Sequence, residues 1–452
     1  MNKHLAGGVL TSALFLLTGS ASAAEPIDLL AATHLALERA PAYAAAEAGQ
    51  KASEEQRGIG RAALLPTLAA TGSMHHFKQR FAYSKPTFLS TSANYNKSSA
   101  GISLVQPLFD MKRWSGYQQG KIAADLGELE LDLVFGNVVL AGASAYLQTV
   151  SAEAALAASR AQEASLRRLA EQSALAFEVG SLTVNETLDA KSRLDLVVAT
   201  RMQAENDLAQ AEANLASLLG SEPVLAVVPF ANTFAPLALP SEEVGEWERR
   251  AAESSPPVRL AEARLALAEQ QARGSAYGHL PTANFIAGVE YDKTTGGSFG
   301  MGTRTNNSHV GVQVDLPLFA GGAVSAKAQQ DEYLRIKAGR EAEESRRQAR
   351  LNARAAFLAV RTSAAQVVAL QAALHSAETA HEAAAAGHEA GLRTIGELLD
   401  SEDRLAATRR DLARAKAAHI EARIRLALVC GEFSDATLVA ANGLLAVATP
   451  VR

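Results

Sequence analysis

Two acidic residues in the last quarter of the chain have the spacing to act as a pair. Glu397 and Asp400 are three positions apart, so both carboxylates can lie on one face of a helix that begins just after a turn. Carboxylates crowded around a narrow opening would repel one another and attract cations. The alternative is an ordinary exposed acidic helix start, which the helix dipole favours whatever the function.

Other residues with chemical potential do not form a recognisable site. His375, His381 and His388 are spaced by six and seven positions, whereas a helical zinc pair needs three or four. The glycine-bearing segment 296–302 lacks the lysine and the following helix start of a phosphate-binding loop, and it indicates a surface hairpin loop. We therefore expect no enzyme activity, no catalytic residue, no metal and no cofactor.

The N-terminus predicts export from the cytoplasm. Lys3 and His4 precede an apolar stretch over 5–17, and the small residues at 21–23 suit a cleavage site. An apolar stretch of about 13 residues is shorter than the roughly 20 that span a bilayer. Residues 1–23 are therefore predicted to be a signal peptide.

Composition limits the remaining possibilities. The formal net charge is −5, which does not suggest a nucleic-acid partner. The single cysteine, Cys430, excludes both an intramolecular disulfide and acylation next to the signal peptide, and we expect it to be buried in a helix. No segment after the signal peptide has 18 consecutive apolar residues, so the chain would have to cross a membrane with strands.

The positions of proline predict two very long helical regions. All 14 prolines lie outside residues 108–222 and 318–449, where strong helix formers dominate. At about 1.5 Å per residue, a helix over 112–177 would be on the order of 100 Å long. Such a helix belongs in a rod rather than in an ordinary globular domain.

The chain repeats itself. A first unit over 24–222, a proline-bearing linker over 223–240 and a second unit over 241–452 share motifs in the same order. The matches are Leu65-Pro66-Thr67 with Leu280-Pro281-Thr282, Pro107-Leu108-Phe109 with Pro317-Leu318-Phe319, and, 211 positions apart, Gly180, Thr183, Glu186, Leu188 and Asp189 with Gly391, Thr394, Glu397, Leu399 and Asp400.

Each unit is predicted to contain two strands. In the second unit, Val310, Val312 and Val314 alternate with polar or small residues, which is the period of a strand with one apolar face. Polar loops are expected over 84–96 and 294–308. Four strands cannot close a barrel that has a lumen, so the exposed edges must pair with another copy of the chain.

The returning helices show a coiled-coil seam. Apolar residues recur every three or four positions in each unit. Arg201 and His419 interrupt the pattern, and we interpret each as a local register feature or a helix edge rather than a ligand. The seam residues are Leu194, Val197, Ala204, Leu208, Ala211, Leu215 and Leu218, and then Leu405, Leu412, Ala415, Ala422, Leu426 and Val429.

Taken together, these motifs resemble the TolC family of outer-membrane factors over nearly the whole mature chain. The resemblance rests on Ala40-Pro41 before an alanine-rich helix, on Pro-Leu-Phe followed by Ala320-Gly321-Gly322, and above all on the turn segment 390–400. The first unit departs from this pattern, with Asp110-Met111-Lys112 in place of the glycine pair. Glu397 stands where the family more often has aspartate, which preserves the charge.

The resemblance implies an α+β membrane protein in the outer membrane of a Gram-negative bacterium. Three copies would form one transmembrane β-barrel, four strands from each, continued by an α-helical coiled-coil barrel across the periplasm. Glu397 and Asp400 would form an acidic ring at the periplasmic gate. Links that close the gate would involve Glu186, Arg393 and His388, with Gly180 and Asp189 at the tip of the first repeat.

The implied function is a passive exit duct, gated at the helix tips. Its partners would be a periplasmic adaptor (a membrane fusion protein), an inner-membrane transporter of the ABC or proton-driven type, and outer-membrane lipid. Type I protein secretion and multidrug efflux both stay open, and the missing lipidation cysteine favours secretion. The alternative, a non-transport periplasmic coiled-coil adaptor or structural surface protein, would explain the helices but not the paired strands with one apolar face.

Overall fold

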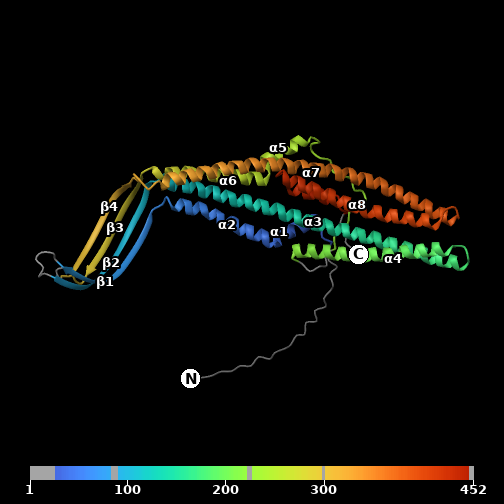
Figure 1. Ribbon diagram of the computed structural model, residues 1–452, viewed down its shortest axis with the longest axis horizontal. Coiled ribbons are helices and arrows are strands. Elements are labelled where there is room, and N and C mark those ends of the chain that lie inside the picture. The colour runs from blue at the N-terminus through green and yellow to red at the C-terminus, as the bar shows by residue number, and fades with distance from the viewer. Residues whose placement is uncertain (1–25, 83–89, 221–225, 298–300, 447–452) are drawn as a thin grey trace, which may run out of the picture.

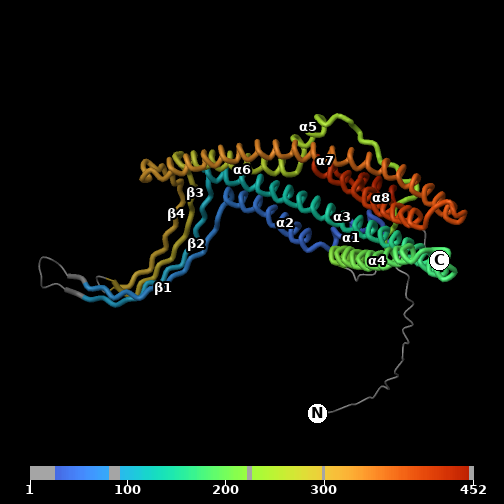
Figure 2. The backbone as a smooth tube through the Cα atoms, turned by 45° about the vertical axis from the view of Figure 1, so that its right-hand side comes forward, coloured from blue at the N-terminus to red at the C-terminus, as the bar shows by residue number. Residues whose placement is uncertain are grey.

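The protein is a long helical rod with a β-sheet at one end (Figure 1). The computed structural model describes residues 26–82, 90–220, 226–297 and 301–446. The predicted signal peptide over 1–23 lies outside the described residues. Figure 2 shows that the strands continue from the ends of α2, α3, α6 and α7, at the opposite end of the rod from the turns that follow α3 and α7.

The same order of elements occurs in both halves of the chain. Two helices, two strands, a very long helix and a returning helix are followed by the same series, and a short helix ends the chain. The first series is α1 (Leu29–Arg39), α2 (Pro41–Ala62), β1 (Thr67–Ala82), β2 (Ser90–Phe109), α3 (Met111–Glu178) and α4 (Val184–Leu219). The second is α5 (Val244–Ser254), α6 (Pro256–Ala276), β3 (Thr282–Thr294), β4 (Thr303–Asp315), α7 (Ala323–Glu389) and α8 (Ile395–Val429), and α9 is Asp435–Asn442.

The long helices confirm the prediction from proline. The helix expected over 112–177 is α3, with 68 residues. It starts directly after β2, because the Asp110 side chain accepts a hydrogen bond from the backbone N–H of Arg113 at 3.0 Å. The second unit instead passes through Gly321 and Gly322, with φ of +61° and +82°, before α7 begins.

The long helices α3 and α7 each contain a stretch that is long and apolar enough to cross a membrane, judged by length and composition alone. Each contains an 18-residue window of high mean hydropathy, and 44% of the α3 window is buried inside the molecule. Two such helices are weak evidence for a membrane span, since a core helix passes the same test. The alanine and leucine residues that make these stretches apolar also pack against neighbouring helices.

The four strands form one antiparallel sheet in the order β1-β2-β3-β4. The register aligns rows of side chains across the sheet, and Leu68, Leu104, Ala287 and Val310 form one of them. Val310, Val312 and Val314 are 72%, 61% and 65% exposed, so the apolar face predicted from their spacing is present and uncovered in one chain.

The predicted loops between the strands were too long. Residues 90–96 belong to β2, Thr294 to β3 and residues 303–308 to β4, whereas we expected loops over 84–96 and 294–308. Residues 84–89 and 298–300 of those predicted loops lie outside the described residues. Side-chain polarity misled the prediction, because an antiparallel ladder is held by backbone hydrogen bonds that polar residues make equally well. Polar cross-strand contacts join in: His76 Nδ1 lies 2.7 Å from Asn96 Oδ1.

The main hydrophobic core lies midway along the rod, where α1, α9 and the linker pack on α3 and α8. Tyr146 of α3 is fully buried there. Its hydroxyl lies 3.1 Å from the Ile27 carbonyl oxygen and accepts a hydrogen bond from the backbone N–H of Val228 at 3.1 Å. The described part of the linker therefore forms part of the core. Burial raises the pKa of Tyr146 well above its usual range.

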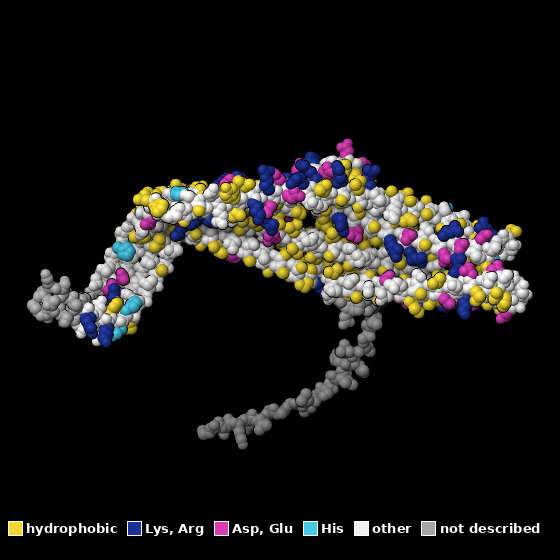
Figure 3. All heavy atoms as spheres, viewed as in Figure 1, with side chains coloured by type: hydrophobic (Ala, Val, Ile, Leu, Met, Phe, Trp, Pro, Cys, Tyr) yellow, Lys and Arg dark blue, Asp and Glu magenta, His cyan; other side chains and the backbone are white. Residues whose placement is uncertain are grey.

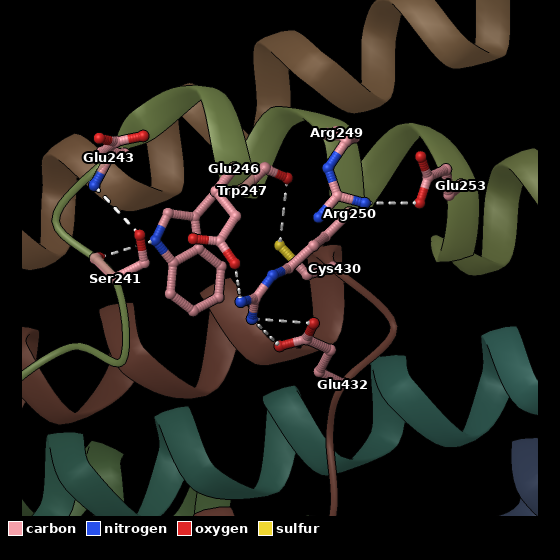
Figure 4. Close-up of polar contacts among 9 residues, drawn as sticks. All are labelled: Ser241, Glu243, Glu246, Trp247, Arg249, Arg250, Glu253, Cys430 and Glu432. Atoms are coloured by element: carbon pink, nitrogen blue, oxygen red, sulfur yellow. Dashed lines mark hydrogen bonds and ion pairs between the residues drawn. The ribbon is translucent and has the colours of Figure 1, made fainter.

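Helix α5 is fastened to the end of α8 by the contacts in Figure 4. The guanidinium of Arg250 lies over the Trp247 ring, 5.0 Å from its centroid, and pairs with Glu432 at 3.2 Å. Cys430 caps α8 and is fully buried beside Trp247, which confirms its predicted burial. Burial raises the pKa of the Cys430 thiol to about 12.

The coiled-coil seam is largely confirmed, since Val197, Ala204 and Leu412 are buried among its members. Arg201 turns from α4 toward α3, where it pairs with Glu163 at 2.5 Å. The helix-edge interpretation of His419 is wrong, because His419 is fully buried between α8 and α7. Its Nδ1 lies 3.1 Å from Ser363 Oγ, and burial lowers the pKa of its imidazole.

Candidate functional site

The two helical hairpins end in turns that share one geometry. Gly180 follows α3 and Gly391 follows α7, with φ of +75° and +70°. In this left-handed conformation a glycine ends a helix without strain. The turns are closed by bonds back into the helix: Ser181 donates to the Ala176 carbonyl at 2.8 Å, and Leu392 donates to the Gly387 carbonyl at 2.8 Å. Both turns lie at the end of the rod farthest from the sheet (Figure 1).

Each returning helix begins with a threonine cap. Thr183 caps α4 and Thr394 caps α8, and each hydroxyl accepts from the backbone N–H three residues on. In the first hairpin Glu186 completes the box by accepting from the Thr183 backbone N–H at 2.9 Å. The hydrogen bonds from the Thr183 backbone and hydroxyl lower the pKa of Glu186.

Arg193 joins the two hairpins. It extends from α4, and its guanidinium Nη1 lies 2.8 Å from both Asp400 Oδ1 and Asp403 Oδ2 on α8. Its Nε lies 3.2 Å from Asp189 Oδ2, one turn earlier on α4. The side chain is only 25% exposed. Burial lowers the pKa of Arg193, but the bonds to Asp400 and Asp403 and the charge of Asp189 raise it more, so the net shift is upward.

The remaining tip residues stay close to their own turn. His388 Nδ1 lies 3.3 Å from the Arg393 carbonyl oxygen, and the Arg393 guanidinium lies 3.9 Å from Glu397. Glu397 is about half exposed. In the described residues of one chain, Arg393 and Glu186 form no pair with each other. A Glu186–Arg393 link between different copies stays a prediction.

A hydrophobic cluster beneath the charges holds the hairpins together. Leu166 of α3, Ala190 of α4 and Leu399 of α8 are fully buried in it. A polar contact lies beside the cluster, where His381 Nε2 is 3.3 Å from Glu402 on α8. Among the described residues no group of His, Cys, Asp and Glu has the arrangement of a metal site. The tip is thus a cluster of charged side chains over a small hydrophobic core.

Several residues of this cluster were named from the sequence, but Arg193, which contacts three of its aspartates, was not. Asp189 and Asp400 were expected at separate tips, and the structure brings both to Arg193. One signal was available: Asp189 and Arg193 recur 211 positions later as Asp400 and Arg404. The repeated pair marks a charged helix face, but it does not reveal that Arg193 reaches across to the other hairpin.

Comparisons with known proteins agree with this architecture. The family model described as outer membrane efflux protein matches residues 32–221 and 247–432. Outer membrane protein TolC of Escherichia coli is 26% identical over 95% of this chain and 87% of its own length. The alkaline protease secretion protein AprF of Pseudomonas aeruginosa is 27% identical, over 94% of this chain and 89% of its own length.

Solved structures share the fold. The Campylobacter jejuni CmeC outer membrane channel superposes with a TM-score of 0.77 at 15% identity, covering 99% of this chain and 98% of that one. The outer-membrane channel OprN gives a TM-score of 0.76 at 18% identity, with 90% of both chains covered. The fold is thus that of TolC-like outer-membrane channels, mainly helical with a few strands, and the relatives are channel proteins rather than enzymes.

The match to the family favours a duct over the alternative of a non-transport adaptor or surface protein. It covers both halves of the chain, including the strand pairs and the long helices that an adaptor reading left unexplained. The relatives come from Gram-negative bacteria and are named as outer-membrane or secretion proteins. This chain therefore belongs to the outer membrane efflux protein family and is an outer-membrane exit duct for secretion or efflux.

Proposed function

We propose that three copies of this chain close into one duct, with a shared transmembrane barrel and a coiled-coil tunnel through the periplasm. One observation carries the proposal: β1 and β4 each have one edge without a neighbour in the described part of the chain. Unpaired edges accept further strands, and rotational symmetry would pair β4 of one copy with β1 of the next. Three sheets of four strands give a barrel of twelve, wide enough for a lumen.

Uncovered apolar surface supports the same assembly. The segment 283–291 of β3 is about 26 Å long at about 3.3 Å per residue, comparable with the roughly 25 Å apolar band of outer-membrane barrels. On α7, Leu351 and Val368 are 60% and 56% exposed. In a ring of copies these side chains would pack against a neighbouring rod rather than face water.

The recurring order of elements supports a duplicated unit. We propose that 24–222 and 241–452 descend from one repeat joined by the linker over 223–240, so that the ring has an approximate six-fold arrangement of hairpins. Equivalent turns at Gly180 and Gly391 then meet at one end of the duct. A periplasmic adaptor and an inner-membrane ABC or proton-driven transporter would dock there and supply energy and cargo. One relative is named as a secretion protein, and the family itself is described by efflux.

Pore formation tests the duct. We expect the mature protein to run as a trimer in detergent and to give stable single channels in planar bilayers. Cysteines placed in the turns near Gly180 and Gly391 should stay protected on intact cells, while cysteines placed between β3 and β4 at 295–297 or 301–302 should react with an impermeant reagent. The native Cys430 is buried and should not interfere. A monodisperse monomer that conducts ions would contradict the trimer.

The gate prediction concerns charge at the tips. We propose that Glu397 and Asp400 of three copies line the opening, with Glu186, Arg393 and His388 holding it closed. Asp400 is paired with Arg193 at 2.8 Å, whereas Glu397 has only a 3.9 Å contact with Arg393. Because an unneutralised carboxylate dominates the local potential, Glu397→Gln should reduce the preference for cations more than Asp400→Asn does.

Reversal potentials in a salt gradient measure this preference. Both variants should largely keep the stability of the trimer, because Glu397 and Asp400 are about half exposed and Arg193 keeps its contacts with Asp189 and Asp403 when Asp400 is neutralised. Unchanged ion preference in the double variant would remove these residues from the gate. Asp411→Asn, an exposed acid farther along α8, is the matched control and should leave the preference unchanged.

A further inference from the structure

The charges of the sheet are divided between its two faces. The strands carry three acidic residues, and the register puts all of them on the face opposite the apolar one. The basic residues divide the other way: only Lys97 shares the acidic face, where it lies 3.2 Å from Asp292. The acidic residues are Glu290, Asp292 and Asp315, and the basic residues of the apolar face are Lys78, Arg80, Lys293 and Arg304.

The four basic residues lie toward the end of the sheet farthest from the helices, as one pair on β3 and β4 and a second pair on β1. Lys293 pairs in register with Arg304, and their row continues through Ser98 to Met74. Lys78 and Arg80 follow on β1 beyond that row. All four side chains are exposed, and within the described residues none has an acidic side chain at ion-pair distance. Basic side chains at this end of the sheet are visible in Figure 3.

Their position relative to the apolar band is specific. Tyr291 is the last large residue on the apolar face of β3, and Lys293 follows it on the same face. Tyrosine marks the level of the membrane interface in outer-membrane barrels. In the duct proposed above, on which this inference rests, the basic residues would therefore begin where the hydrocarbon ends, on the side away from the helices, in the outer leaflet.

We propose that Lys78, Arg80, Lys293 and Arg304 form a binding site for phosphorylated glycolipid headgroups of the outer leaflet. Guanidinium and ammonium groups at the membrane surface attract phosphate, and arginine does so with two parallel hydrogen bonds. The lack of acids on this face removes the repulsion that such a ligand would meet on the other face. In the ring of copies proposed above, β4 adjoins the next β1, so the two basic pairs would form one belt.

Native mass spectrometry of the full-length trimer in detergent tests the site. The probe is diphosphorylated lipid A, compared with its dephosphorylated form and with inorganic phosphate. We expect the diphosphorylated lipid to bind, and the Lys293→Gln/Arg304→Gln variant to bind it about 30-fold more weakly, since each basic residue near a membrane surface contributes about fivefold in affinity. Lys78→Gln/Arg80→Gln should show a similar loss.

Lys97→Gln is the matched control, because Lys97 lies at the same level of the sheet but on the opposite face. An equal loss in this control would overturn the proposal, since it would mean a general effect of charge. Equal binding of the dephosphorylated lipid would also overturn it, as would displacement of the lipid by millimolar inorganic phosphate. The same variants are also recorded in planar bilayers. If the variants form pores like those of the wild type and bind the lipid as well as the wild type does, the lipid site is refuted and the duct is not. If the wild-type protein itself forms no pores, the duct is refuted.

Discussion

Replacing Arg193 by alanine is expected to open the tip of the duct and to raise single-channel conductance several-fold. The substitution leaves Asp189, Asp400 and Asp403 close together without their shared cation. Like charges at such separations repel, and the repulsion would drive α4 and α8 apart. Because Arg193 is three-quarters buried, its loss should destabilise the chain by about 2 kcal/mol, between the values for exposed and buried pairs.

The control for Arg193 is Arg409→Ala. Arg409 pairs with Glu378 at 3.1 Å between α8 and α7, and both side chains are about two-fifths exposed. Its loss should change conductance little. Bilayer recordings at low and high salt separate the two cases further, because screening weakens the repulsion among the three aspartates. If Arg193→Ala lowers the unfolding midpoint but leaves conductance unchanged, Arg193 holds the hairpins together without acting on the gate.

Gly120→Ala is expected to prevent normal assembly, although it adds one carbon to a helix. A Cβ at position 120 of α3 would overlap the carbonyl oxygen of Gln56 on α2. A backbone carbonyl within a helix cannot move away by changing a rotamer, as a side chain can, so α2 and α3 would have to separate. We expect a loss of about 3 kcal/mol or more from overpacking, seen as a lower unfolding midpoint and less trimer.

Gly116→Ala, one turn earlier on the same helix, provides the comparison. A Cβ at position 116 meets nothing within 4 Å. Alanine is the better helix former by about 1 kcal/mol, so this variant should be neutral or slightly more stable. If the two variants behaved alike, the close approach of α2 and α3 would not be the constraint at Gly120. Chemical unfolding followed by circular dichroism makes the comparison directly.

Much of the fold was predictable because its signals are local. The absence of proline predicted a helix over 112–177, and the structure has Met111–Glu178. The alternation of Val310, Val312 and Val314 predicted both a strand and its apolar face. Such patterns depend on neighbouring residues and on the geometry of one element, which is why one sequence suffices to find them.

The parts that were missed depend on contacts between distant residues. The burial of Tyr146 against Ile27 and Val228 joins three remote segments, and no pattern within any one of these segments shows which of the others it contacts. The reach of Arg193 from α4 to Asp400 has the same cause. The polar strand ends over 90–96 were missed for another reason, since serine and asparagine signal turns while backbone pairing decides the strand.

The nearly equal lengths of α3 and α7 act as a ruler for the molecule. They contain 68 and 67 residues, so at about 1.5 Å per residue both hairpins extend about 100 Å from the sheet. Matching deletions of seven residues from α3 and α7, with equal deletions from the antiparallel helices packed against them, would shorten the rod evenly by about 10 Å and keep the heptad phase. A deletion in one helix alone would leave one set of tips short. The length of the duct is therefore set by the number of helical turns in both α3 and α7, and neither helix can change that number unless the other changes by the same amount.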